Sequence, residues 1–452
     1  MSKKNKKIAV VGAGITGLVT AWKLQSLGVE VEIFERKAEP GGAIKTVQAD
    51  EWQVEYGPNT LLLKDRKVAE FLAEIGLSGE KEIANPEAQK RFIVKDGQLE
   101  PLPSSLMSAI QTSLFSFPGK LRVLAEPFIP KNRERDQTVA EFVERRLGSD
   151  ILDYALNPFV AGIYANRPED LSLRHAFPMM DNLEMEYGSL IWGAVAGARK
   201  RKEDSSRVDR ELISFEKGLQ QLPKTVAAEL NHIHLNHEIQ SVRKIDGDWT
   251  VQSNMGQFGP YDRVVMNTPL YKLNRELIPV REDQLDKLNR VNYPPLSVML
   301  LGFKKDQVRH ELDGFGFLVP EKENRKILGA LFSSTLFNNR APKDSHLVTV
   351  FIGGGRQPEL AQKDSEELLR IVLDELKDLI GLTGNPQFKD HVFWPKSIPG
   401  YHVGYDEILN TLSEIEEENP GLILAGNFRH GISVPDCIKN GLDLAVKLAE
   451  RG

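Results

Sequence analysis

Two kinds of apolar pattern alternate along the chain. Short runs rich in β-branched residues, bounded by glycine or polar positions, predict buried strands, whereas apolar residues spaced three or four apart predict helices. The strand patterns occupy residues 8–11, 29–34, 233–235, 239–244, 249–253, 263–267, 297–303, 328–332, 347–352 and 422–425. Helical patterns cover residues 68–76, most of 99–198, 365–380 and 435–448, and the charged run 200–207 is expected to be an exposed linker or loop.

The order of these elements predicts an α/β fold in which one domain is assembled from distant segments. A strand, a glycine-rich turn and a helix open the chain, and residues 422–448 repeat that order near its end. The run at 263–267 is interpreted as a strand that returns to the first sheet. At 452 residues the chain exceeds the roughly 250–300 residues that one core serves, so two or three domains are expected.

The first strand pattern leads into a nucleotide-binding fingerprint. Gly12 permits a tight turn, Gly14 lets the backbone approach a pyrophosphate, and Gly17 lets the next helix pack closely on the strand. The N-terminus of that helix offers unpaired N–H groups to phosphate oxygens. Glu35 ends the second strand, where a carboxylate can accept hydrogen bonds from a ribose. The sequence therefore predicts a dinucleotide site.

Two further glycine segments favour FAD over a nicotinamide dinucleotide. Gly41 and Gly42 form a doublet in a loop where side chains would obstruct a closely approaching cofactor. Gly426 and Asn427 follow the last strand, and Pro435 suits the first position of the next helix. A second helix N-terminus is therefore available to another part of the same cofactor.

Composition excludes several classes of protein. The net charge of −6 gives no electrostatic footprint for nucleic acid, and the single cysteine, Cys437, excludes an internal disulfide framework and favours a cytoplasmic location. The longest uncharged stretch, residues 101–119, is interrupted by proline and serine, so it does not match a bilayer-spanning segment. Residues 102–130 are unusually apolar. We interpret them as core helices of a second domain, with a peripheral contact to the inner face of the cell membrane as the alternative.

Four separated segments, residues 55–60, 162–173, 314–320 and 426–441, closely resemble the oxygen-dependent protoporphyrinogen oxidase family, and the similarity runs essentially end to end. The resemblance implies FAD as the cofactor. It also implies the six-electron dehydrogenation of a porphyrinogen to a porphyrin in heme biosynthesis, with dioxygen reoxidising the flavin. Three parts are implied: a Rossmann-type FAD-binding domain, a mixed-sheet substrate domain, and a helical insertion that can contact membranes. We expect them at residues 1–65, 206–270 and 390–452; 66–90 and 271–389; and 91–205, respectively.

The resemblance also assigns cofactor-binding positions. Gly57 matches the position whose backbone faces the flavin ring, Val434 matches the one whose N–H approaches the pyrimidine edge, and Ile239 matches the one whose backbone pairs with adenine. The complete candidate set is Gly12, Gly14, Ile15, Thr16, Gly17, Glu35, Arg36, Gly41, Gly42, Gly57, Pro58, Ile239, Gly426, Asn427, Ser433 and Val434.

Four residues are candidates for binding a large, flat, mostly apolar substrate edged by carboxylates. Arg91 aligns with the family arginine that meets a substrate propionate, and a guanidinium can bind a carboxylate bidentately. Phe315 and Leu318 match pocket walls of the family, and Phe351 is a candidate for the opposite wall. A surface salt bridge for Arg91 and ordinary core packing for the others are the structural alternatives. We identify no catalytic proton acceptor and expect no metal site.

Several functions remain open at this stage. Protoporphyrinogen is preferred to coproporphyrinogen III because the Arg91 segment resembles the former type more closely. A flavin amine oxidase is the second candidate enzyme class. A flavin-binding chaperone or a membrane-recruited scaffold is the candidate non-enzymatic function. The sequence does not decide between a monomer and a homodimer.

Overall fold

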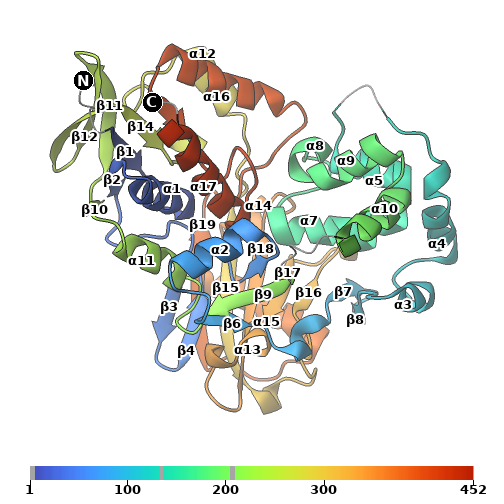
Figure 1. Cartoon of the computed structure of the whole chain (residues 1–452). Helices are drawn as coiled ribbons and strands as arrows, with labels where there is room; N and C mark the ends of the chain where they lie inside the picture. Colours follow the sequence, from blue (N-terminus) through green and yellow to red (C-terminus); the bar gives the residue numbers. More distant parts are fainter. Residues whose placement is uncertain (1–5, 133–135, 204–208, 451–452) are drawn as a thin grey trace.

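The first strand lies at the centre of a five-stranded parallel sheet. The computed structural model describes residues 6–132, 136–203 and 209–450 (Figure 1). Across this sheet the order is β10 (Ile233–Leu235), β2 (Glu30–Glu35), β1 (Lys7–Val11), β14 (Arg263–Met266) and β20 (Leu422–Leu424). All four pairings are parallel. The predicted α/β fold, with a Rossmann-type domain assembled from distant segments, is confirmed.

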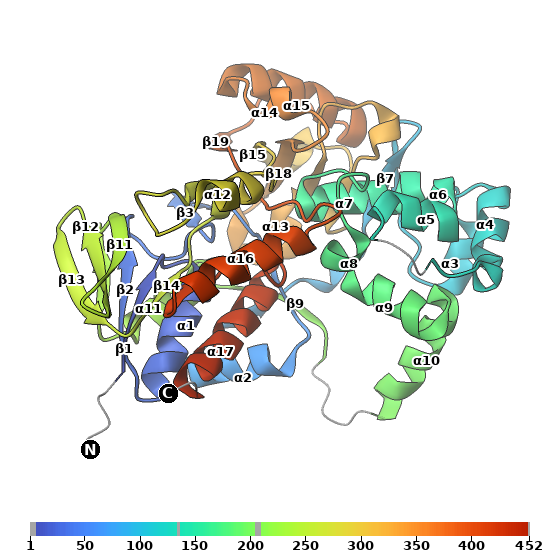
Figure 2. The ribbon, with the colours of Figure 1, turned by 90° about the horizontal axis from the view of Figure 1, so that it is seen from above.

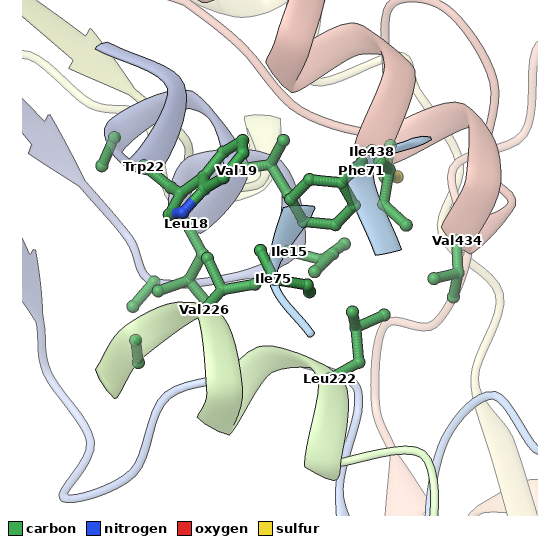
Figure 3. Close-up of a cluster of buried hydrophobic side chains, with 14 of the residues drawn as sticks. Ile15, Leu18, Val19, Trp22, Phe71, Ile75, Leu222, Val226, Val434 and Ile438 are labelled. Carbon is green, nitrogen blue, oxygen red and sulfur yellow. The ribbon is translucent and has the colours of Figure 1, made fainter. Parts of the chain in front are cut away.

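Apolar side chains cover both faces of this sheet, which explains why its strands are near-continuous apolar runs. Helices α1 (Ile15–Ser26) and α17 (Val434–Glu450) lie side by side on one face, although they come from opposite ends of the chain. Figure 3 shows their side chains meeting those of α2 (Arg66–Glu74) and α11 (Gln221–Ala228). The other face is covered by a small antiparallel sheet and two helices: β11 (Ile239–Ile245), β12 (Asp248–Ser253), β13 (Gly256–Tyr261), α12 (Glu282–Leu288) and α16 (Asp406–Glu418).

A second, seven-stranded mixed sheet stands beside the first. Its order is β19 (Phe388–Trp394), β15 (Leu296–Lys304), β18 (Ser345–Gly353), β17 (Gly329–Phe332), β16 (Gly316–Leu318), β7 (Phe92–Lys95) and β8 (Gln98–Pro101). Helix α15 (Ser365–Ile380) covers one face of this sheet (Figure 2). The opposite face packs partly against β4 (Trp52–Glu55) and partly against the helical insertion defined below.

Helices gather on one side of the molecule between β8 and β9 (Glu211–Phe215), away from the β11–β13 sheet (Figures 1 and 2). They are α3 (Leu106–Gln111), α4 (Phe117–Leu124), the short helix η2 (Glu126–Phe128), α5 (Val139–Leu147), α6 (Ser149–Ile151), the π-helical turn η3 (Leu152–Leu156), α7 (Asn157–Tyr164), α8 (Leu173–Ala176), α9 (Pro178–Tyr187) and α10 (Leu190–Glu203). We call this group the helical insertion.

A buried charge cluster holds the helical insertion together. Arg146 is fully buried and donates to Glu126 Oε1 at 2.9 Å and to Glu184 Oε1 at 2.6 Å. Glu126, also fully buried, accepts hydrogen bonds from the Leu190 N–H at 2.9 Å and from the Ser189 hydroxyl, so its carboxylate satisfies the N-terminus of α10. One arginine thus joins η2, α5, α9 and α10.

Several boundaries differ from the expected ones. The α2 residues Val68, Phe71 and Leu72 pack in the core formed by α1 and α17, and β6 (Lys81–Ile83) pairs with β9 in a separate small sheet. The segments 92–101 and 388–394 are strands of the second sheet. Helix α10 continues through Glu203, where an exposed linker was expected, and residues 204–207 of that run lie outside the described chain.

The interpretation of residues 102–130 as core helices is wrong for much of the segment. No residue of α4 is buried, and large apolar side chains are exposed on it and beside it: Met107, Ile110, Phe117, Leu121, Leu124 and Phe128. Phe128 is 88% exposed. Leu114 is fully buried and anchors the segment to the second sheet. Within the described chain, no helix combines the length and apolarity needed to cross a lipid bilayer.

Candidate functional site

The three glycines of the first turn occupy their positions for different structural reasons. A Cβ at Gly12 would lie 2.5 Å from the Asn267 carbonyl oxygen, and one at Gly17 would lie 2.1 Å from the Gly12 carbonyl oxygen, so folding alone requires glycine at both. Gly14 has an ordinary extended backbone, and the nearest atom to its Cβ would be Asn267 Nδ2 at 3.5 Å. Neither backbone strain nor internal packing requires glycine there. Gly14 therefore keeps open space above the turn, as a bound pyrophosphate needs.

The N-terminus of α1 is available to a phosphate. Gly14 is its N-cap, and no side chain caps the helix, so its first-turn N–H groups can serve a ligand. Ile15 and Thr16 lie in this turn with buried side chains. Their contribution to a cofactor would thus come from the main chain.

Glu35 is buried at the end of β2 and holds the turn. Its Oε2 accepts a hydrogen bond from the Ala13 N–H and its Oε1 accepts one from the Lys37 N–H, each at 2.9 Å. A carboxylate has about four acceptor positions, so two remain for the hydroxyls of a ribose. Arg36 follows on the surface. The predicted ribose carboxylate is thus also the residue that fixes the turn.

The loop with the glycine doublet lies directly against this turn. The Gly41 N–H donates to the Ala13 carbonyl at 2.8 Å, and a Cβ at Gly42 would lie 3.1 Å from Gly14 Cα. Both glycines have positive φ angles, 123° and 64°. A Cβ at Gly57 would lie 2.0 Å from the Ala43 carbonyl oxygen, so close backbone approach continues to the Gly57-Pro58 turn.

The end of the chain returns to the same edge of the first sheet. Because β1, β14 and β20 are parallel, α1 and α17 both begin at the carboxyl edge of the sheet. Gly426 and Asn427 follow β20, and the Ser433 hydroxyl accepts the Asp436 N–H at 3.2 Å at the start of α17. Val434 is the first residue of α17. Ile239 begins β11 and is half-buried. The structure thus brings both predicted cofactor segments together, and their residues fit an extended dinucleotide such as FAD.

A buried ion pair supports the strand that leads to Gly57. Glu55, at the end of β4 (Trp52–Glu55), lies 3.6 Å from Arg340, and both side chains are only 2% exposed. Glu55 accepts hydrogen bonds from the Thr46 hydroxyl at 2.7 Å and the Leu219 N–H at 2.8 Å. Burial raises the pKa of Glu55 to about 7 despite the attraction of Arg340. This pair joins the end of β4 to the segment between β17 and β18, beside the glycine turns.

The candidate substrate residues lie on the face of the second sheet that α15 leaves uncovered. Strand register places Ile93, Leu318, Gly329 and Phe351 in one row across β7, β16, β17 and β18. Gly329 contributes no side chain, and a Cβ there would lie 3.2 Å from Leu318 Cδ2. We call this set the apolar row. Leu318 and Phe351 are both half-buried and flank the glycine.

Arg91 and Phe315 lie at the β7 end of the apolar row. The guanidinium carbon of Arg91 is 5.2 Å from the centre of the Phe315 ring, which is a cation–π distance. Arg91 is exposed, and within the described chain no carboxylate pairs with it. The surface salt bridge considered as an alternative is therefore absent among the described residues. The guanidinium is available to a ligand.

Two glycines shape this face, and neither was predicted from the sequence to be a site residue. Gly162 of α7 contacts Leu318, because a Cβ at Gly162 would lie 2.8 Å from Leu318 Cδ2. Gly329 interrupts a strand pattern, which is the usual sign of a close approach or a bulge. Attention to glycines within predicted helices and strands would have found both.

Comparisons with known proteins agree with this architecture. A model of the flavin containing amine oxidoreductase family matches residues 15–449. Protoporphyrinogen oxidase 2, chloroplastic/mitochondrial, of Arabidopsis thaliana is 35% identical over 474 residues, which span 97% of this chain and 93% of the plant protein. Coproporphyrinogen III oxidase of Bacillus subtilis (strain 168) is 24% identical over 465 residues, spanning 98% and 97% of the two chains. A crystal structure from Exiguobacterium sp. 255-15, provisionally named a protoporphyrinogen oxidase, superposes with a TM-score of 0.83 at 23% identity over both complete chains.

Proposed function

Because the chain belongs to the flavin-containing amine oxidoreductase family, we propose that it oxidises protoporphyrinogen IX to protoporphyrin IX in heme biosynthesis, with dioxygen as the electron acceptor. The cofactor is FAD, and the α1 and α17 segments would hold it. The observation that carries the choice of substrate is Arg91. Its guanidinium has no protein carboxylate partner in the described chain and stands at one end of the apolar row. That arrangement suits a flat apolar macrocycle with an acidic edge.

The protein would contribute mainly binding and orientation. Bound FAD would supply the redox chemistry, taking up two electrons at a time and passing them to dioxygen. Arg91 would bind a propionate, and Phe315, Leu318 and Phe351 would exclude water from the macrocycle face. Six electrons and six protons leave the porphyrinogen in all. Fixing one substrate carbon at the reactive position supplies the orientation that such a transfer needs.

Coproporphyrinogen III is the alternative substrate, because a coproporphyrinogen III oxidase is also similar over nearly its full length. The deciding experiment is a porphyrin fluorescence assay of both porphyrinogens with the FAD-loaded protein, run with and without oxygen. We expect faster product formation from protoporphyrinogen and none without oxygen. Preference for coproporphyrinogen would reverse the assignment, and the absence of either porphyrin would contradict the proposed function.

Replacing Arg91 by alanine is expected to raise the KM for the porphyrinogen roughly ten- to a hundredfold, because one charge-assisted contact is lost. The kcat should change little, since a propionate lies away from the reacting carbons. Lysine at this position should rescue part of the affinity. Lys90→Ala is the matched control, because Lys90 is adjacent, exposed and already paired with Asp313. An unchanged KM in Arg91→Ala would remove Arg91 from the substrate site.

We also propose that the exposed apolar side chains of the helical insertion contact a lipid surface. Six of them come from residues 107–128, and Met179, Met185, Trp192 and Val195 add exposed apolar area on α9 and α10. Ten large exposed apolar side chains within one group of helices are more than the scattered single ones that a soluble surface ordinarily carries. Such a contact would place the enzyme peripherally at the inner face of the cell membrane.

Vesicle flotation with the full chain tests this contact. The double variant Phe117→Ser/Phe128→Ser should reduce the fraction bound to anionic vesicles at least about tenfold, because two large apolar side chains no longer enter the interface. Met255→Ser is the control, since Met255 is 67% exposed but lies in the β12–β13 turn. Failure of the native chain to float at low salt would exclude the lipid contact. Sedimentation of that chain as a dimer would instead favour a second copy as the partner.

A further inference from the structure

The segment between β20 and α17 lacks regular secondary structure, although it presents the start of α17 to the cofactor. Residues 426–433, which we call the flavin loop, contain Gly426 and Gly431, whose φ angles are 149° and 112°. Such a loop needs contacts from elsewhere to keep one conformation, because glycine loses more conformational freedom on ordering than other residues. These contacts must come from residues outside the flavin loop.

Two buried tyrosines hold the flavin loop from one side. Tyr401 and Tyr405 are 2% and 1% exposed, and their ring centres are 4.8 Å apart. The Tyr405 hydroxyl donates to the Phe428 carbonyl at 2.7 Å, and the Tyr401 hydroxyl donates to the Asn427 carbonyl. The Tyr401 hydroxyl also accepts the Gly431 N–H at 3.1 Å. Three hydrogen bonds from two side chains therefore reach both arms of the loop.

These hydroxyls act as donors at all physiological pH values. Burial raises the pKa of both phenols well above the ordinary value for tyrosine, so neither ionises under working conditions. Buried amide and carbonyl groups of the flavin loop would lose their partners if the hydroxyls were removed, and water could not easily replace them.

The tyrosines are themselves fixed by the helical insertion. The Ser172 N–H donates to the Tyr401 carbonyl at 2.6 Å. Asp136 accepts the Ser172 hydroxyl at 2.7 Å with one oxygen and the Gly404 N–H at 3.0 Å with the other. The segment 401–405 is thus held by main-chain and carboxylate contacts on one side, while its two phenols face the flavin loop on the other.

We propose that Tyr401 and Tyr405 are positioning residues for FAD, which hold the flavin loop in its cofactor-binding conformation without touching the substrate. The hydrogen bonds favour that conformation over the others that a glycine-containing loop can adopt. Cofactor affinity scales with the fraction of protein in the competent conformation, so loss of the bonds weakens binding. A loop that is less well fixed also places the positive end of α17 less accurately beside the flavin ring.

The test compares phenylalanine variants of three buried tyrosines. Tyr401→Phe loses two hydrogen bonds to the flavin loop, and Tyr405→Phe loses one. Tyr164→Phe is the control, because Tyr164 is 5% exposed and its hydroxyl donates at 2.8 Å to the Ala176 carbonyl within the helical insertion. For each variant, the FAD dissociation constant is measured by titrating the deflavinated protein with FAD, and the flavin midpoint potential and urea unfolding are measured on the reloaded protein.

The FAD dissociation constant should rise roughly tenfold in Tyr401→Phe and roughly threefold to fivefold in Tyr405→Phe, with a lower midpoint potential in both. Tyr164→Phe should lose stability to urea but keep the native affinity and potential. Native affinity and potential in the two loop variants, or an equal change in all three, would overturn the proposal. If Tyr401→Phe does not fold, Tyr405→Phe decides the question by the same criteria.

Discussion

Gly14→Ala is expected to weaken FAD binding at least about a hundredfold while the protein still folds. The substitution puts a methyl group into the open space above the first turn, where the pyrophosphate must approach the backbone. Two charge-assisted hydrogen bonds from that turn would be lost, each worth about 1.5–3 kcal/mol. The backbone of Gly14 is already in a conformation that alanine adopts, and the nearest protein atom to the new Cβ is 3.5 Å away. The folded apoprotein should therefore be nearly unaffected.

Gly17→Ala provides the contrasting variant. Its Cβ would lie 2.1 Å from the Gly12 carbonyl oxygen, so the helix would have to move away from β1. Overpacking of this kind costs about 1–3 kcal/mol or more, and the loss should appear in the unfolding of the apoprotein. Titration of both apoproteins with FAD and urea unfolding separate the two effects. Native FAD affinity in Gly14→Ala would show that the phosphates do not lie above this turn.

Arg146→Ala is expected to destabilise the helical insertion by about 3–5 kcal/mol, because it leaves the buried carboxylate of Glu126 without a cation. Glu184 loses one of its two guanidinium partners and keeps the other, Arg145. Glu126 is 0% exposed, so water cannot solvate its carboxylate in place of the guanidinium. The carboxylate of Glu126 also satisfies the first turn of α10, and disturbing it should loosen that helix. Urea unfolding followed by limited proteolysis at α10 measures the loss.

Arg174→Ala is the control for this substitution. Arg174 pairs with Asp406 at 3.4 Å on the surface, where both side chains are more than half exposed. Exposed pairs of this kind contribute about 1 kcal/mol or less. If Arg146→Ala cost no more than Arg174→Ala, the buried cluster would be a packing feature without an electrostatic role.

The parts of the fold that the sequence predicted are those that depend on local patterns. Helix α15 has the predicted bounds, because Asp364 caps its start and Gly381 ends it in a left-handed conformation. Strands β1, β2 and β14 coincide with short apolar runs. These runs end before Gly12, at Glu35 and before Asn267, respectively. In each case the signal lies within a few residues of the element that it predicts.

The errors involve partners that are distant in the sequence. The apolar face of α2 is visible in the sequence, but its contact with a helix some 360 residues later is not. Phe117 and Phe128 are apolar in composition but exposed, because hydropathy identifies a side chain without saying what covers it. The apolar row needs the register of four strands between Ile93 and Phe351, and no local pattern contains it.

The candidate cofactor and substrate residues remain predictions at the level of ligand contact. Arg36 and Ser433 are exposed and Glu35 is committed to two backbone N–H groups, so their direct contacts depend on the bound state. These positions could be predicted from the sequence through its resemblance to a known family. The sequence could not show that Gly12 and Gly17 are required by the fold itself while Gly14 is not, since that distinction depends on where Asn267 lies.

The first sheet combines strands from the beginning and the end of the described chain, which affects how the protein can fold during synthesis. Strand β20 and helix α17 are synthesised after every other described element, yet they complete the sheet that β1 begins. Until they emerge from the ribosome, one edge of β14 is unpaired and the surface of α1 that packs against α17 is uncovered. FAD therefore cannot stabilise the nascent N-terminal domain as a finished unit. The two segments proposed to hold FAD can therefore meet only after α17 has been synthesised.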